Sequence, residues 1–212
     1  METGWEATLM VRLLASGSAD SATLLREFQP KLKAPQMEAL GLTKEQLVEA
    51  FNETRSAWIK EDEEGWLASH DFYPEAVAAV KHLVATNEDV YIITTKDAKF
   101  AKRLLAKVEV SIPDSKVYGL GSGKKWNTLQ SLLGEAGRAE DTRAFFLEDR
   151  LKALEEVLEE VDGRELVRSK TDLAFATWGY NGQRERDIAT SKGMAVLDEA
   201  AFLALARGHA VA

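Results

Sequence analysis

The chain has 212 residues, of which 45% are hydrophobic and 29% charged, and its formal net charge is −8 at pH 7. This hydrophobic content is enough for a substantial buried core, and the excess of acidic residues argues against general binding to nucleic acid. The sequence contains no cysteine, which excludes disulfides, thiolate nucleophiles and cysteine-bound zinc.

The segment 1–71 has the patterns of helices and none of a strand. Thr43 and Gln46 have the spacing of a capping box, which predicts the start of a helix. The stripe predicted for its buried face is Leu47, Phe51, Thr54 and Trp58. The acidic run 62–64 and Gly65 interrupt this pattern, so we predict a purely helical module over 1–71.

From residue 72 onward, helical stripes alternate with short apolar runs. Pro74 is well placed as the first residue of a helix, and the apolar run 90–94 predicts a strand that is buried on both faces. Further strands are predicted near 117–118, 144–147, 173–177 and 195–197. Asp198 is placed to cap a last helix. Helices between successive strands indicate a parallel sheet covered on both faces, so we predict an α/β core over 72–212.

Polar residues follow several of these apolar runs. Ligands of parallel α/β sheets bind at the carboxyl ends of the strands, so these positions are candidate site residues. Glu148 and Asp149 follow one run, and two adjacent carboxylates suit Mg²⁺, which prefers oxygen ligands. An alternative is that Asp149 only caps the following helix. Thr94 and Thr95 follow another run, and the Thr94 hydroxyl has the alternative of satisfying nearby backbone groups.

Lys124 and Lys125 follow the glycine-rich segment 119–123. This segment is not a P-loop, because Tyr118 stands where the first glycine of that motif would be and Lys125 replaces its Ser or Thr. On its own, the segment predicts a flexible loop that leads into a helix.

The order of these features resembles motifs two, three and four of the haloacid dehalogenase superfamily: a hydroxyl at one strand end, a lysine at the start of a helix, and an acidic pair at the next strand end. Segment 72–74 resembles the step that enters the core of that superfamily, and segment 92–96 resembles its second motif. Segments 118–123, 146–151 and 177–181 resemble a plant and cyanobacterial branch of it. The resemblance implies a Rossmann-like core preceded by a partial helical cap. It also implies a magnesium-dependent phosphatase that acts on a small phosphorylated metabolite.

The resemblance assigns roles to the candidate residues. Thr94 would hydrogen-bond a phosphoryl oxygen, with Thr95 beside it in the substrate site. Lys125, or Lys124 if the alignment slips by one residue, would stabilise phosphoryl charge. Asp149, with Glu148 beside it, would hold Mg²⁺. We expect no nucleic-acid partner and no membrane span, and a soluble protein of the cytoplasm or a plastid.

One motif of the superfamily is not found. Its nucleophile lies in a D-x-D sequence, and this chain contains none; the nearest segment, 62–64, lies in a charged helical stretch. The resemblance therefore implies that the central strand carrying the nucleophile is missing, that the chain is inactive, and that Mg²⁺ binds weakly. Two alternatives follow, an enzyme seen as an incomplete chain and a non-catalytic protein that binds a phosphorylated ligand. The missing strand would lie between the strands ending at Thr94 and near Leu147.

Overall fold

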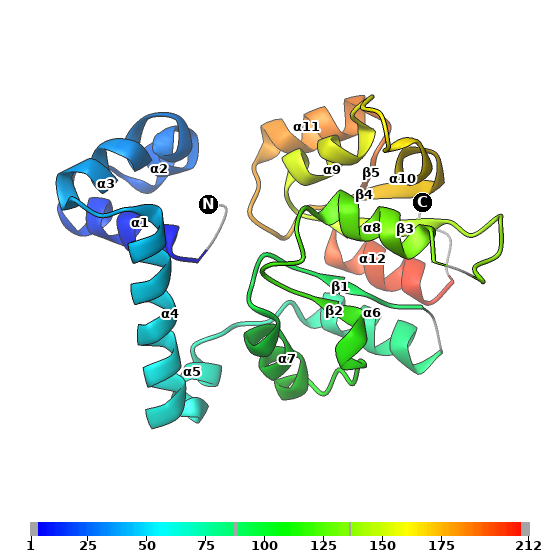
Figure 1. Ribbon diagram of the computed structural model, residues 1–212, viewed down its shortest axis with the longest axis horizontal. Helices are drawn as coiled ribbons and strands as arrows, with labels where there is room; N and C mark the ends of the chain where they lie inside the picture. The colour runs from blue at the N-terminus through cyan, green and yellow to red at the C-terminus, as the bar shows by residue number, and fades with distance from the viewer. Residues whose placement is uncertain (1–3, 87–88, 136, 209–212) are drawn as a thin grey trace. The chain divides into compact units, whose positions relative to one another are not determined.

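The computed structural model describes residues 4–86, 89–135 and 137–208. The chain folds as two compact units, Met1–Asp71 and Phe72–Ala212, which are shown in Figure 1. The protein is an α/β protein with parallel sheets, and all described strands lie in the second unit. The boundary between the two units, after Asp71, lies where the sequence changes from purely helical patterns to alternating helices and strands.

The first unit is helical in its described residues. Its elements are α1 (Glu6–Ala15), α2 (Ser21–Glu27), a π-helical segment (Phe28–Leu32), α3 (Lys33–Leu40), α4 (Lys44–Glu61) and α5 (Glu63–Ala68). The main cluster of buried apolar side chains in this unit consists of Trp5, Leu9, Leu13, Leu24, Phe28 and Leu47, and Ile59 and Trp66 are buried outside it.

Helix α4 confirms one sequence prediction and corrects another. The capping box is present, since the Thr43 hydroxyl accepts a hydrogen bond from the Gln46 amide and the Gln46 side chain accepts one from the Thr43 amide. The predicted stripe is wrong in its second half, because Thr54 and Trp58 are exposed. Only the first turns of α4 pack on the core cluster, and in its last turns the buried side chain is Ile59 rather than Trp58.

The second unit alternates helices and strands. Its helices are α6 (Pro74–Ala85), α7 (Ala98–Lys107), α8 (Lys125–Leu133), α9 (Leu151–Leu158), α10 (Glu165–Lys170), α11 (Gln183–Ser191) and α12 (Glu199–Ala206). Its strands are β1 (Ile92–Ile93), β2 (Val117–Tyr118), β3 (Ala144–Glu148), β4 (Thr171–Ala176) and β5 (Ala195–Leu197). Two local signals are confirmed: Pro74 is the first residue of α6, and the Asp198 carboxylate caps α12 by accepting a hydrogen bond from the Ala201 amide at 2.8 Å.

The strands form two parallel sheets rather than one. β1 pairs with β2, with Ile92 opposite Val117. β3 pairs with β4, and β4 with β5, in the order β3-β4-β5. Within the described residues, no backbone ladder joins β1 to β3. The single continuous sheet that alternation suggests is therefore divided between these two strands.

Burial follows this division. In β4, which has a neighbour on both sides, Ala174 and Phe175 are 0% exposed, whereas Phe145 in β3 is 48% exposed. Ile92 and Ile93 of β1 are only half-buried. The prediction of a five-residue strand buried on both faces at 90–94 is thus wrong, because the pairing of β1 with β2 covers two residues and no other described strand pairs with β1.

Helices hold the two sheets together. α6 packs against α12, and the Glu199 carboxylate accepts a hydrogen bond from the Ala76 amide at 3.4 Å. On the other side, Leu129 of α8 belongs to the main buried cluster, against which Ile93 also packs. The two sheets therefore stay in one unit without sharing a ladder.

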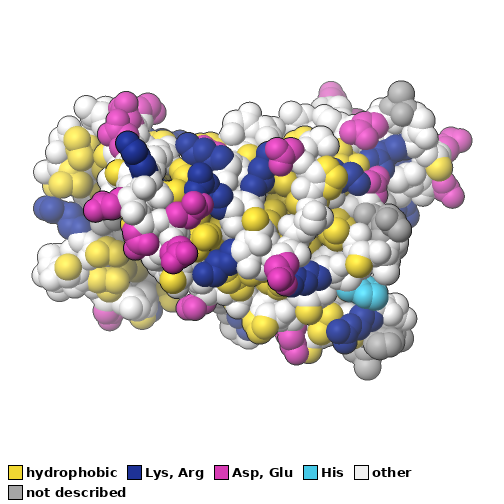
Figure 2. Space-filling view, turned by 90° about the horizontal axis from the view of Figure 1, so that it is seen from below, with side chains coloured by type: hydrophobic (Ala, Val, Ile, Leu, Met, Phe, Trp, Pro, Cys, Tyr) yellow, Lys and Arg dark blue, Asp and Glu magenta, His cyan; other side chains and the backbone are white. Residues whose placement is uncertain are grey.

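The surface carries no single dominant charge on the face seen in Figure 2, where acidic and basic side chains of the second unit are interspersed with apolar ones. Among the described residues, no helix is both long enough and apolar enough to cross a bilayer.

Candidate functional site

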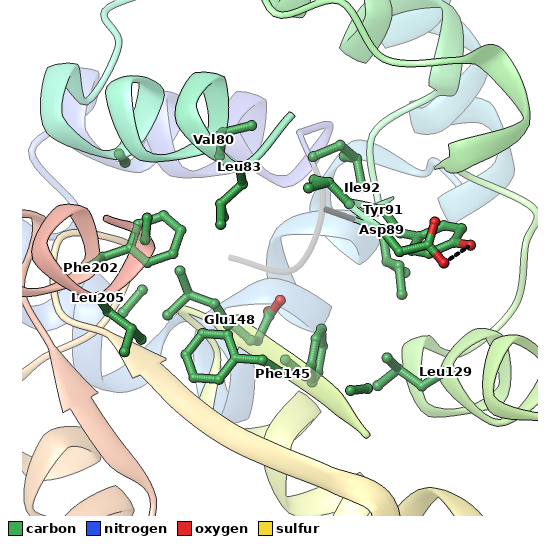
Figure 3. A pocket seen from close by; sticks show the side chains of 18 of the residues that line it. Val80, Leu83, Asp89, Tyr91, Ile92, Leu129, Phe145, Glu148, Phe202 and Leu205 are labelled. Carbon is green, nitrogen blue, oxygen red and sulfur yellow. Dashed lines mark hydrogen bonds between the residues drawn. The ribbon is translucent and has the colours of Figure 1, made fainter. Parts of the chain in front are cut away.

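A cavity of about 1010 Å³ lies between β1 and β3. Its walls come from both strands and from helices α6, α8 and α12, and the segment 176–180 closes part of one end. Figure 3 shows Val80 and Leu83 of α6 on one side of the cavity, with Phe145 and Glu148 of β3 across from them. Glu148 and Asp149 are the two predicted site residues that line it.

Glu148 is the last residue of β3 and forms an ion pair with Lys125, the first residue of α8. Its side chain is 5% exposed, and its Oε2 atom accepts a hydrogen bond from the Lys125 ammonium group. Its Oε1 atom is buried and has no hydrogen-bond partner among the described residues. Burial raises the pKa of the Glu148 carboxyl group, and the charge of Lys125 opposes this in part. The site thus contains a buried carboxylate of which only one oxygen accepts a hydrogen bond from a described residue.

The structure separates the two candidate lysines. Lys125 is directed at the site, with a side chain that is 17% exposed. Lys124 is 60% exposed and pairs instead with Glu156 of α9 at 2.9 Å. Of the two alignments that the sequence left open, the one with Lys125 places a cation beside the acidic pair.

Asp149 does not cap the following helix. Its Oδ2 atom accepts a hydrogen bond from the Tyr180 amide at 2.7 Å, and α9 begins after Arg150 without a side-chain cap. The Asn181 side chain donates to the Asp149 carbonyl group at 3.2 Å. Gly179 is needed here, because a Cβ atom at that position would lie 2.1 Å from the Asp149 Cβ. The loop after β4 therefore holds Asp149 in place at the end of β3.

Thr94 and Thr95 lie at the end of β1, outside the lining of the cavity. The Thr94 hydroxyl accepts a hydrogen bond from the Lys96 amide at 3.1 Å, which is the local role that the sequence left open as an alternative. No hydrogen bond between described residues joins the Thr94 side chain to Lys125, Glu148 or Asp149. The structure therefore brings together Lys125, Glu148 and Asp149, but not the two threonines.

The residues fit Mg²⁺ only in part. Glu148 and Asp149 supply two carboxylates, and the unpartnered Glu148 Oε1 atom is a free oxygen of the kind that Mg²⁺ takes as a ligand. Within the described ranges, no group of three or more His, Cys, Asp or Glu side chains is placed to hold a metal ion. The acidic pair is therefore suited to be one side of a magnesium site whose other oxygens come from water, substrate or a further segment.

A second charged cluster lies at the opposite end of the cavity, and the sequence analysis missed it. Asp89 pairs with Lys116 and with Arg138, and Arg138 also donates to the Tyr91 hydroxyl at 2.6 Å. The hydrogen bond from Lys116 is the main reason that the pKa of Asp89 is lowered. The only signal in the sequence was that charged residues flank the apolar runs, which is too common to predict a contact between residues 49 positions apart.

Comparison with known proteins does not assign this chain to a family: no family model, no curated protein and no solved structure matches it.

Proposed function

We propose that the second unit is the core of a magnesium-dependent phosphohydrolase of the haloacid dehalogenase type, acting on a small phosphorylated metabolite. The observation that carries this proposal is the contact between Lys125 and the buried Glu148, beside Asp149, at the carboxyl end of β3. A cation next to two carboxylates at a strand end offers a site for an anion and a place for a hard metal ion.

The chemistry supports this assignment. Phosphoryl transfer depends mainly on positioning and on neutralising negative charge. Lys125 would contact the phosphoryl oxygens, and the Thr94 hydroxyl, which accepts from the Lys96 amide, would donate its own proton to one of them. Glu148 and Asp149 would hold Mg²⁺, which supplies positive charge against the phosphate when it is bound.

The nucleophile is the part that this chain does not supply. The 212 residues contain no D-x-D sequence. The nearest acidic segment has a structural role, because Asp62 caps α5 by accepting a hydrogen bond from the Gly65 amide at 2.8 Å. We therefore propose that these 212 residues bind phosphate and do not hydrolyse phosphate esters.

The second candidate is a protein that binds a phosphorylated ligand without catalysis, and the missing D-x-D sequence favours it. Both candidate functions require the same phosphate-binding site, but only the phosphohydrolase would hydrolyse a phosphate ester once a nucleophile is supplied. Phosphate binding can therefore be tested first.

Two neighbouring lysines provide a matched test of phosphate binding. Inorganic phosphate should bind the wild-type chain in the presence of Mg²⁺, as measured by ³¹P NMR titration. Lys125→Met should weaken this binding at least about tenfold, because a charge-assisted hydrogen bond contributes roughly 1.5–3 kcal/mol. Lys124→Met removes the same charge from a side chain that points to Glu156, and should leave the affinity within about twofold. Equal losses in both variants, or none in Lys125→Met, would contradict the proposed site.

A further inference from the structure

The facing edges of β1 and β3 are unpaired. β1 pairs with β2 on one side and β3 pairs with β4 on one side, and no described residue forms a ladder with the other side of either strand. Each of these edges carries backbone N–H and C=O groups on an apolar strand, which is the arrangement that accepts an added strand. The cavity between them, which we call the slot, is therefore bordered by two such edges.

The volume of the slot is sufficient for one strand. A five-residue strand is about 17 Å long and takes up roughly 4.8 Å of sheet width and 10 Å between the layers, or about 800 Å³. The cavity volume is about 1010 Å³. β3, which forms one border of the slot, is itself five residues long.

The two faces of the slot are apolar. Val80 and Leu83 of α6 and Phe202 of α12 line one face (Figure 3). Leu129 and Leu132 of α8 line the other. A segment that is apolar on both of its faces is the complement of such walls, as in the central strands of parallel sheets.

The direction of an added strand also follows from the structure. Asp89, which precedes β1, pairs with Arg138, which precedes β3, and with Lys116, which precedes β2. The segments that enter these strands therefore meet at one edge of the unit. A strand that is parallel to both borders would begin at this cluster and end near Glu148, whose buried Oε1 atom accepts no hydrogen bond from a described residue.

We propose that the slot binds an extended apolar peptide segment of about five residues as a parallel strand, and so joins β2-β1 and β3-β4-β5 into one sheet. Backbone hydrogen bonds to both borders provide the affinity, and the apolar walls select the side chains. Binding of such a segment does not need the phosphate site, so the slot can be tested without any phosphorylated ligand.

The test uses the full 212-residue chain and a fluorescent peptide of five alternating valines and isoleucines between pairs of lysines. Binding is measured by fluorescence anisotropy. The control peptide has proline at its central position, which removes a ladder donor. We expect saturable binding of the first peptide and at least about tenfold weaker binding of the second.

A matched pair of variants locates the binding site. Phe145→Lys places a charged side chain inside the slot at a position that is 48% exposed, and should weaken binding about tenfold or more. Val161→Lys makes the same kind of change at a position that is 49% exposed and outside the slot, and should have no effect.

Hydrogen exchange then distinguishes a strand from any other occupant. Backbone amides in 92–93 and 144–148 should exchange more slowly when the peptide is bound, because a ladder forms on both borders. Failure to bind, equal binding of the proline peptide, equal binding by Phe145→Lys, or binding that leaves these amides unprotected would each overturn the proposal. So would a slot filled by a second copy, seen as a dimer that Phe145→Lys dissociates and the peptide does not.

Discussion

At the scale of single residues, Glu148 is the most informative side chain of the site. It is 6% exposed, its pKa is raised by burial, and it forms an ion pair with Lys125. An acid whose pKa is higher in the folded state than in the unfolded state stabilises the fold only at low pH, and that stabilisation is lost as the pH rises through the raised pKa.

The resulting prediction concerns the pH dependence of stability. We expect the free energy of unfolding of the wild-type chain, relative to Glu148→Gln, to fall as the pH rises from the ordinary glutamate pKa to the raised one. Glutamine does not titrate and retains an oxygen that accepts from Lys125, so the difference between the two proteins isolates this carboxyl group. Urea unfolding at a series of pH values from about 4 to about 8 measures it. A difference that does not change with pH would contradict the raised pKa.

The sequence predicted the composition of the site better than its contacts. Lys125, Glu148 and Asp149 were identified because strand ends in parallel sheets are binding positions. The choice between Lys124 and Lys125 needed the structure, since it depends on where each side chain points at the first turn of α8. The contact of Asp149 with the Tyr180 amide joins residues 31 positions apart and has no local signal.

At the scale of elements, β3 and β4 offer a direct comparison. Phe175→Ala in β4 should destabilise the protein by about 3–5 kcal/mol, because a fully buried phenylalanine is removed. Phe145→Ala in β3 removes the same side chain from a position that is 48% exposed, and should cost less than about 1 kcal/mol. Chemical denaturation of the two variants tests this. Similar losses would mean that Phe145 is covered in solution and that the slot is closed.

Helices and strands that are marked by residues within a few positions in the sequence could be predicted, and those without such residues could not. Thr43, Pro74 and Asp198 sit at helix starts, where capping chemistry depends only on neighbouring residues. α11 was not predicted, because its sequence is mostly polar and its one fully buried residue is Ala189. The length of β1 was overestimated, because strand pairing depends on a neighbour that the local sequence does not specify.

At the scale of the whole molecule, the slot lies next to the proposed phosphate and magnesium site formed by Lys125, Glu148 and Asp149. Glu148 and Asp149 line the slot at the carboxyl end of β3. Lys125, which does not line the slot, forms the ion pair with Glu148. A strand that fills the slot would therefore deliver its last residues to the acidic pair. The pattern of alternating helices and strands predicted a parallel α/β unit, but only the structure shows that no ladder between described residues joins β1 to β3.

The most direct test supplies that strand with a nucleophile. The wild-type chain, with Mg²⁺ and an aryl phosphate, is assayed with a peptide of five valines and isoleucines followed by Asp-x-Asp, and with a control peptide that ends in Asn-x-Asn. We predict no turnover from the chain alone or with the control, and turnover with the Asp-x-Asp peptide that Lys125→Met abolishes. If both peptides bind in the slot and the Asp-x-Asp peptide produces no turnover, the protein is not the core of a phosphohydrolase of this type.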